Sequence, residues 1–94
     1  MSILAATLKI PHIFRKLING QKEIPLKPGI LTDIFKEVKE SYPELAEAIL
    51  DDKGFVKGYM LLILDKKIIN NHEMNTLFIE DEQVLKVIIP MSGG

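Results

Sequence analysis

The residues best placed to do chemistry in this sequence are its last two, Gly93 and Gly94. Glycine loses more backbone entropy than any other residue when it is ordered, so two glycines at a chain end resist folding onto the body. Without side chains, this backbone can lie flat in a narrow slot of a partner and present its α-carboxylate. The four residues after Pro90 span roughly 13–14 Å when extended, enough to enter such a slot. Two glycines at this place also arise by chance or as a cloning remnant.

A terminal carboxylate acylates poorly until adenylation turns it into a mixed anhydride. The partner must supply the nucleotide site, because residues 53–58 (KGFVKG) lack the spacing and the following Ser or Thr of a phosphate loop. The absence of cysteine excludes a disulfide scaffold, a thiolate metal site and a cysteine nucleophile. The terminal carboxylate therefore favours a carrier protein that a partner enzyme activates, and we predict that the chain itself is not an enzyme.

Side-chain catalysis and metal binding find little support. His12 and His72 lie far apart in the sequence without neighbouring ligand clusters, so we interpret both as ordinary polar side chains. The acidic pairs and runs at 51–52 and 80–82 are typical of solvated loops. No Ser, His and Asp combination suggests a triad. We predict no metal and no bound cofactor.

Composition narrows the class of protein further. The 94 residues suffice for one modest core, 47% are hydrophobic, and the net charge is −1, which predicts no binding to nucleic acid. The longest apolar run, residues 59–64, is far shorter than the roughly 20 residues that span a bilayer, and the N-terminal residues lack the basic flank of a signal peptide. We expect no membrane association and a cytoplasmic location.

The first part of the chain predicts a long-connected hairpin. Apolar residues alternate over 6–10 until Pro11 ends the pattern, and alternation returns over 22–27. Between these strands, Asn19-Gly20 suits positive φ.

A helix is predicted next, with Thr32 as its cap, Asp33 at its positive end and Pro43 as its stop. Its apolar residues recur at helical spacing: Leu31, Ile34, Phe35, Val38 and Tyr42. Residues 43–50 predict a second short helix or turn, and residues 51–58 a loop.

The last part predicts three strands: a continuous apolar one over 59–64, a short partner over 68–70 and a final one over 84–89, which Pro90 ends. The irregular polar segment between the last two is anchored by residues 77–79. The element order indicates an α+β fold in which a mixed sheet of four to five strands packs on one main helix. We expect a domain over 1–90 and a flexible tail over 91–94.

The strand over 59–64 has apolar residues on both faces, as a strand buried on both sides does. One face packs on the helix and the other needs a cover, which is either another protein or the chain's own short helix or 70–80 loop. For the first case, the expected partner-binding residues are Met60, Leu62 and Ile88, with Met91 and Ser92 of the tail.

The strand order and the "IIPMSGG" ending resemble the ubiquitin-like β-grasp sulfur carriers, the family of the thiamine sulfur carrier and the molybdopterin synthase small subunit. The likeness spans residues 8–94, and "GQK" at 20–22 with "YMLLILDKKII" at 59–69 is similar to the branch that serves cysteine or homocysteine synthesis. Two features differ: "IEDEQ" replaces a glycine-containing acidic turn, so we expect a different turn there, and Ile89 stands where many members have a first proline.

The resemblance implies a mechanism. An adenylating enzyme related to the ubiquitin activators binds the sheet face, takes in residues 91–94 and joins the Gly94 carboxylate to AMP from ATP. Sulfur then displaces AMP and leaves a thiocarboxylate on Gly94, while Gly93 grants access and Met91 and Ser92 guide the tail. A second partner receives the sulfur, either a pyridoxal-phosphate sulfhydrylase or the molybdopterin synthase large subunit.

Two alternatives remain open at this point. The same activated Gly94 could form isopeptide bonds with lysines of target proteins, as in a ubiquitin-like modifier. In the other alternative, the chain is a plain interaction domain that binds through its apolar sheet face and has an idle tail.

Overall fold

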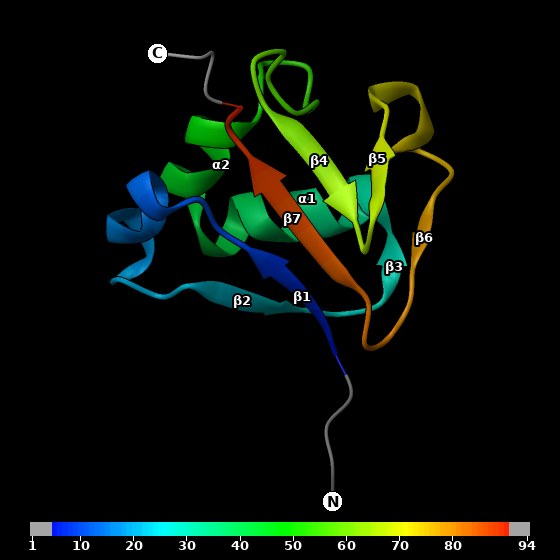
Figure 1. The fold of residues 1–94 in the computed structure, drawn as a ribbon, viewed down its shortest axis with the longest axis horizontal. Helices are drawn as coiled ribbons and strands as arrows, with labels where there is room; N and C mark the ends of the chain where they lie inside the picture. The colour runs from blue at the N-terminus through cyan, green and yellow to red at the C-terminus, as the bar shows by residue number, and fades with distance from the viewer. Residues whose placement is uncertain (1–4, 91–94) are drawn as a thin grey trace, which may run out of the picture.

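A five-stranded mixed sheet lies at the centre of the computed structural model, which describes residues 5–90 (Figure 1). Its strand order is β2-β1-β7-β4-β5, in which β1 and β7 are parallel and all other neighbours antiparallel. The bounds are β1 (Ala6–Lys9), β2 (Glu23–Leu26), β4 (Leu61–Leu64), β5 (Lys67–Ile69) and β7 (Val84–Ile88). The predicted α+β plan with a mixed sheet is confirmed, and the last long strand is the central one.

Two helices, α1 (Leu31–Ser41) and α2 (Pro43–Ile49), pack on one face of this sheet (Figure 1). The predicted apolar stripe of α1 is confirmed, because Leu31, Ile34, Phe35 and Val38 are all buried. Pro43 ends α1 as expected and also begins α2, since proline is well suited to the first turn of a helix.

The predicted cap of α1 is wrong. The N-cap residue is Ile30, without a side-chain hydrogen bond, and Thr32 lies inside the first turn. The free N–H groups of that turn are satisfied by the loop before β6 instead: Leu31 N–H donates to the Leu77 carbonyl at 2.9 Å, and Thr32 N–H to the Met74 carbonyl at 3.1 Å. A tertiary contact thus replaces the local cap that the sequence suggested.

The connections contain the remaining elements. The predicted hairpin of β1 and β2 is confirmed, and its long connection is a 3₁₀ helix, η1 (His12–Ile18), followed by Asn19 and Gly20 at positive φ. A small antiparallel pair, β3 (Gly29–Ile30) with β6 (Phe78–Ile79), and a short 3₁₀ helix, η2 (Asn71–Glu73), lie beside the main sheet. Within residues 5–90, no helix is long and apolar enough to cross a membrane.

The turn before β7 contains a residue with positive φ at the place where the resemblance leads us to expect a different turn. Glu82 has φ of 70°, in the left-handed region that favours glycine. The backbone therefore makes the conformation that a glycine adopts readily, but with a glutamate in that place.

The core lies between the sheet and the helices and consists of apolar side chains. Among the described residues, no polar or charged residue is buried, and no buried side-chain nitrogen or oxygen lacks a partner. Ile79 of β6 and Met74 after η2 are fully buried, so the 71–79 segment closes one end of this core. Within residues 5–90, the sheet, the helices and this segment bury the core between them.

Candidate functional site

The central strand β7 carries the chain toward the residues that the sequence singles out. It is paired along both sides, with β1 from Thr7↔Val84 onward and with β4 up to Leu61↔Ile88. Its inward side chains, Leu85 and Val87, are buried, and Ile89 still packs against the core after the strand ends. Pro90 is exposed and is the last described residue. The chain is thus firmly held up to Ile89 and leaves the sheet at its middle.

The beginning of β7 is fixed by a hydrogen-bond network that the sequence reasoning missed. The Asp65 carboxylate in the β4–β5 turn accepts from Val84 N–H at 3.1 Å and from Gln83 Nε2 at 3.3 Å. The Gln83 side-chain oxygen accepts in turn from Glu80 N–H at 2.7 Å. Asp65 itself has φ of 55°, which aspartate tolerates better than most residues. An aspartate directly after an apolar strand was the available signal for this turn.

The face of the sheet opposite the helices is the surface that a partner can reach. Figure 1 looks onto this face, where β1, β7 and β4 lie in front of α1 and, in the described part of the chain, no helix covers them. The strand registers align its side chains in rows, and we call these residues the open face: Thr7, Lys9, Glu23, Pro25, Leu61, Ile63, Ile68, Val84, Lys86 and Ile88.

The open face combines apolar groups with two lysines, and one carboxylate, that of Glu23, lies opposite Lys9. Ile63 pairs with Ile68 on one side and with Lys86 on the other, and Lys86 pairs with Lys9. Leu61, Ile63 and Ile88 are half-buried, and Ile68 is 54% exposed. Half-buried aliphatic groups around a pair of lysines form a surface that suits a protein partner with apolar and acidic groups.

Two of the expected partner-binding residues need a correction. Met60 and Leu62 are only 5% and 3% exposed. The register of β4 turns Leu62 toward the helices, and Met60, directly before the strand, is buried as well. They are core residues, and the neighbouring Leu61 and Ile63 take their place on the open face. β4 also begins at Leu61, two residues later than predicted, and Tyr59 before it is 59% exposed. Ile88 does lie on the open face, as expected.

The other candidate residues fall outside any catalytic arrangement. His12 is exposed on η1 with its Nδ1 at 3.5 Å from Arg15 Nη1, and His72 is exposed on η2. The Asp51 carboxylate accepts from Lys53 N–H and Phe55 N–H and so shapes its own loop. Across residues 5–90, no group of three His, Asp or Glu side chains is arranged to hold a metal ion. Met91, Ser92, Gly93 and Gly94 lie outside the described residues.

Comparison with solved structures finds close matches to the whole fold. A chain of the Amycolatopsis orientalis BexX/CysO complex superimposes with a TM-score of 0.80 at 19% identity, covering 96% of this chain and 100% of that one. Mycobacterium tuberculosis CysO gives 0.78 at 17% identity, with 92% and 99% covered. The small archaeal modifier protein 1 (SAMP1) of Methanosarcina acetivorans gives 0.72 at 22% identity, with 99% and 100% covered.

Comparison of the sequence alone assigns no family to the chain. No protein-family model matches the chain. A Saccharomyces cerevisiae protein whose name proposes a nitronate monooxygenase activity is 38% identical over 64 residues, which are 68% of this chain. The chain spans only 16% of that protein's length, too little to bring its activity to this chain. The structural matches, in contrast, extend over nearly all of both chains. The resemblance seen in the sequence is confirmed at the level of structure: the chain has the ubiquitin-like β-grasp fold of the CysO and SAMP1 proteins.

Proposed function

We propose that the protein is a sulfur carrier whose Gly94 carboxylate is adenylated by a partner enzyme and converted into a thiocarboxylate. The observation that supports this most is the position of the Gly-Gly sequence, which four residues separate from Ile88, where the central strand of a CysO-like fold ends. β7 is paired with a strand on each side, and Ile89 after it packs against the core, so the chain is anchored in the sheet up to the residue before Pro90. In this proposal, residues 1–90 form the carrier body and residues 91–94 the working tail.

The chemistry takes place in two steps at the terminal carboxylate, first at one of its oxygens and then at its carbon. A carboxylate oxygen of Gly94 attacks the α-phosphorus of ATP, which gives an acyl adenylate and releases pyrophosphate. A hydrosulfide or enzyme-bound persulfide sulfur then attacks the acyl carbon, the C–O bond to AMP breaks, and AMP leaves. In the persulfide case, reduction of the S–S bond by a thiol frees the thiocarboxylate. The carrier supplies the carbon and the partner supplies ATP, so we propose that the carrier is a co-substrate and not an enzyme.

The residues divide into a reacting tail and a docking surface. Gly94 carries the acyl group, Gly93 gives access to a narrow channel, and Met91 with Ser92 guides the chain into it. The open face docks the body on the adenylating enzyme, with Leu61, Ile63 and Ile88 as apolar contacts. Lys9 and Lys86 favour a partner whose matching surface is acidic, which speeds encounter at low salt.

The receiving enzyme is the finer part of the proposal. The likeness of the sequence to the cysteine and homocysteine branch favours a pyridoxal-phosphate sulfhydrylase in the cytoplasm. The molybdopterin synthase large subunit is the alternative receiver. Assay of both enzymes with the thiocarboxylated carrier distinguishes them, because only the correct receiver will return the carrier to its carboxylate form.

A second candidate function is protein modification through Gly94, and the match to a small archaeal modifier protein favours it. Both functions share the adenylate, but a modifier forms isopeptide bonds with target lysines. Conjugates that survive thiol reductants would support modification. A plain interaction domain with an idle tail is the third alternative, and its activity would survive deletion of Gly93 and Gly94.

Intact-mass spectrometry of the protein from its native host tests the main proposal. We expect a species that ends at Gly94 and is heavier than the sequence mass by the exchange of one oxygen for one sulfur. Alkylation of this species should label the C-terminal residue, since the chain has no cysteine to compete. A chain that ends elsewhere in the native host would contradict the proposal.

A further inference from the structure

A hollow lies beside the end of β7, and the proposed carrier chemistry makes no use of it. Because β1 runs parallel to β7, η1 follows β1 at the end where β7 leaves the sheet, and residues 57–60 reach the same end before β4 (Figure 1). α2 joins them there, since η1 packs beside it and Lys57 N–H donates to the Ile49 carbonyl at 3.0 Å. The hollow opens among these three segments with a volume of about 390 Å³, and we call it the exit hollow: Leu17, Glu44, Glu47, Ala48 and Lys57.

The exit hollow combines an apolar part with charges of both signs. Leu17 and Ala48 are half-buried, so part of each aliphatic side chain is open to a ligand. Lys57 is half-buried as well, whereas Glu44 and Glu47 are exposed on α2. A ligand with one apolar side chain, several N–H donors and one carboxylate matches this set of groups.

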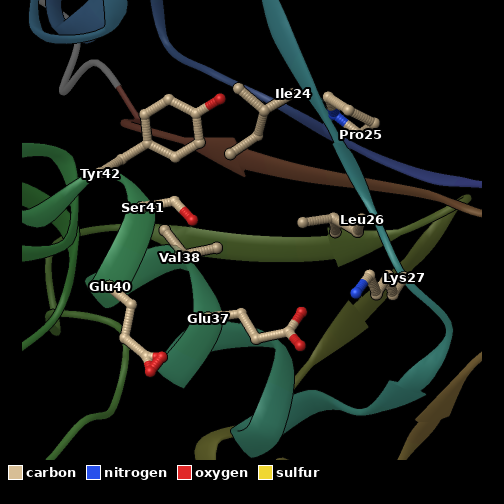
Figure 2. A pocket seen from close by; sticks show the side chains of 9 residues that line it. All are labelled: Ile24, Pro25, Leu26, Lys27, Glu37, Val38, Glu40, Ser41 and Tyr42. Carbon is tan, nitrogen blue, oxygen red and sulfur yellow. The ribbon is translucent and has the colours of Figure 1, made fainter.

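A hollow of similar volume, about 350 Å³, lies between β2 and the end of α1 and has different borders (Figure 2). Its side chains, among them Leu26, Lys27 and Glu37, come from β2 with the residue after it and from residues 37–42. None comes from η1, α2 or residues 57–60. Of these two hollows, the exit hollow is therefore the one that borders the end of β7.

The chain beyond Pro90 carries the groups that fit the exit hollow. Residues 91–94 lie outside the described residues, and their length of roughly 13–14 Å when extended is enough to cross the hollow. Residues 85, 87 and 89 face the core under the sheet, and Met91 is the next in this series. We propose that residues 91–94 rest in the exit hollow while the protein is free of its partners.

Each end of this segment has its own contact in the hollow. The Met91 side chain packs over Leu17 and Ala48. The Gly94 carboxylate accepts from the Lys57 ammonium group, and backbone N–H groups between the two ends donate to the carboxylates of α2. Because glycine loses much entropy when it is ordered, the docked tail stays in balance with a free one that a partner can take up.

The docked tail also has a consequence for activation. It withholds the Gly94 carboxylate, so the apparent affinity of the adenylating enzyme falls with the docked fraction. This consequence rests on the proposed function, but the docking itself does not. The test below uses the carrier alone, so its failure would leave the carrier function untouched.

Paramagnetic relaxation enhancement in the ¹⁵N-labelled full chain tests where the tail rests. The chain has no cysteine, so Ser92→Cys gives a single attachment point for a nitroxide label, on the side of the extended backbone opposite Met91. We expect stronger broadening of the amide signals at residues 44–48 than at residues 61–63 of β4. Equal broadening of both sets would overturn the proposal. Broadening concentrated at residues 68–71, which border another hollow beyond β4, would overturn it as well.

Two lysine variants of the labelled chain test the contact of the carboxylate. Lys57→Gln should lower the ratio of docked to free tail about 2- to 5-fold, as expected for a partly exposed ion pair. Lys53→Gln removes the same charge from an exposed position outside the exit hollow and should leave the ratio unchanged. No change in Lys57→Gln, or an equal fall in both variants, would overturn the proposal.

Two variants of η1 test the contact of the methionine. Leu17→Ser removes apolar surface from the hollow and should lower the ratio of docked to free tail about 5-fold. Ile13→Ser is the matched control, because Ile13 is 58% exposed on the same element and lies outside the hollow. An unchanged ratio in Leu17→Ser would overturn the apolar contact.

Discussion

The two faces of the central sheet come from the same strands but differ in burial and in charge. On the inner face, Leu62, Leu64, Leu85 and Val87 are buried against the helices. On the open face, aliphatic side chains alternate with them and are only half-buried, and Lys9 and Lys86 lie among them. The buried core does not include these outer aliphatic groups, and in the proposed function a partner protein covers them.

The largest effect should come from truncating neighbours on opposite faces of β4. Leu62→Ala leaves a cavity in the core, and we expect the free energy of unfolding to fall by about 2–5 kcal/mol. Ile63→Ala removes a half-buried group and should cost about 1 kcal/mol or less. Urea denaturation of both variants measures the difference. Equal losses would mean that the two faces are not energetically distinct.

In binding to the adenylating enzyme, unlike in stability, a change at Ile63 should matter more than a change on the inner face. Ile63→Asp places a charge in the apolar part of the open face, and we expect KM for the carrier in the adenylation reaction to rise about 10-fold while the fold is kept. Ile13→Asp serves as the matched control, because Ile13 is 58% exposed on η1 and lies outside the open face. A rise of KM in both variants would contradict a docking role for the open face.

A smaller effect on binding is expected at the edge of this face. Tyr59 is exposed two residues before Leu61, which pairs with Ile88 near the point where the chain leaves the sheet. Tyr59→Ala should raise KM about 3- to 5-fold, with rescue by Tyr59→Phe, since an exposed aromatic group is a frequent interface anchor. Phe78→Ala removes an aromatic group of similar exposure from β6 and should leave KM unchanged.

The smallest expected effect concerns stability at the turn that leads into β7. A non-glycine residue in the left-handed conformation costs about 1–2 kcal/mol, and Glu82→Gly removes this strain. Glycine also raises the entropy of the unfolded chain, which costs about 0.5–1 kcal/mol of stability. We therefore expect the free energy of unfolding to rise by about 0.5–1 kcal/mol. Thermal unfolding measures the gain. Glu80→Gly, two residues earlier, should give none, and destabilisation by Glu82→Gly would show that the glutamate side chain stabilises the turn.

The sequence predicted the elements that have a clear period. Alternation around Lys9 and helical spacing from Leu31 to Val38 indicated β1 and α1, and both are confirmed. The continuous apolar run of β4 has no period, so its faces could not be assigned until pairing with β7 set the register. For this reason Met60 and Leu62 were placed on the wrong face. The cap at Thr32 was wrong for a related reason, because a distant loop satisfies the helix.

The central claim is that the last backbone carboxylate does the work, and its chemical removal is the most direct test. A semisynthetic protein that ends in a Gly94 amide keeps every side chain and the whole folded body, and it differs from a ligated acid control at one atom group only. The adenylation assay should show ATP–pyrophosphate exchange with the acid and none with the amide. Sulfur transfer at an equal rate with the amide would contradict the account.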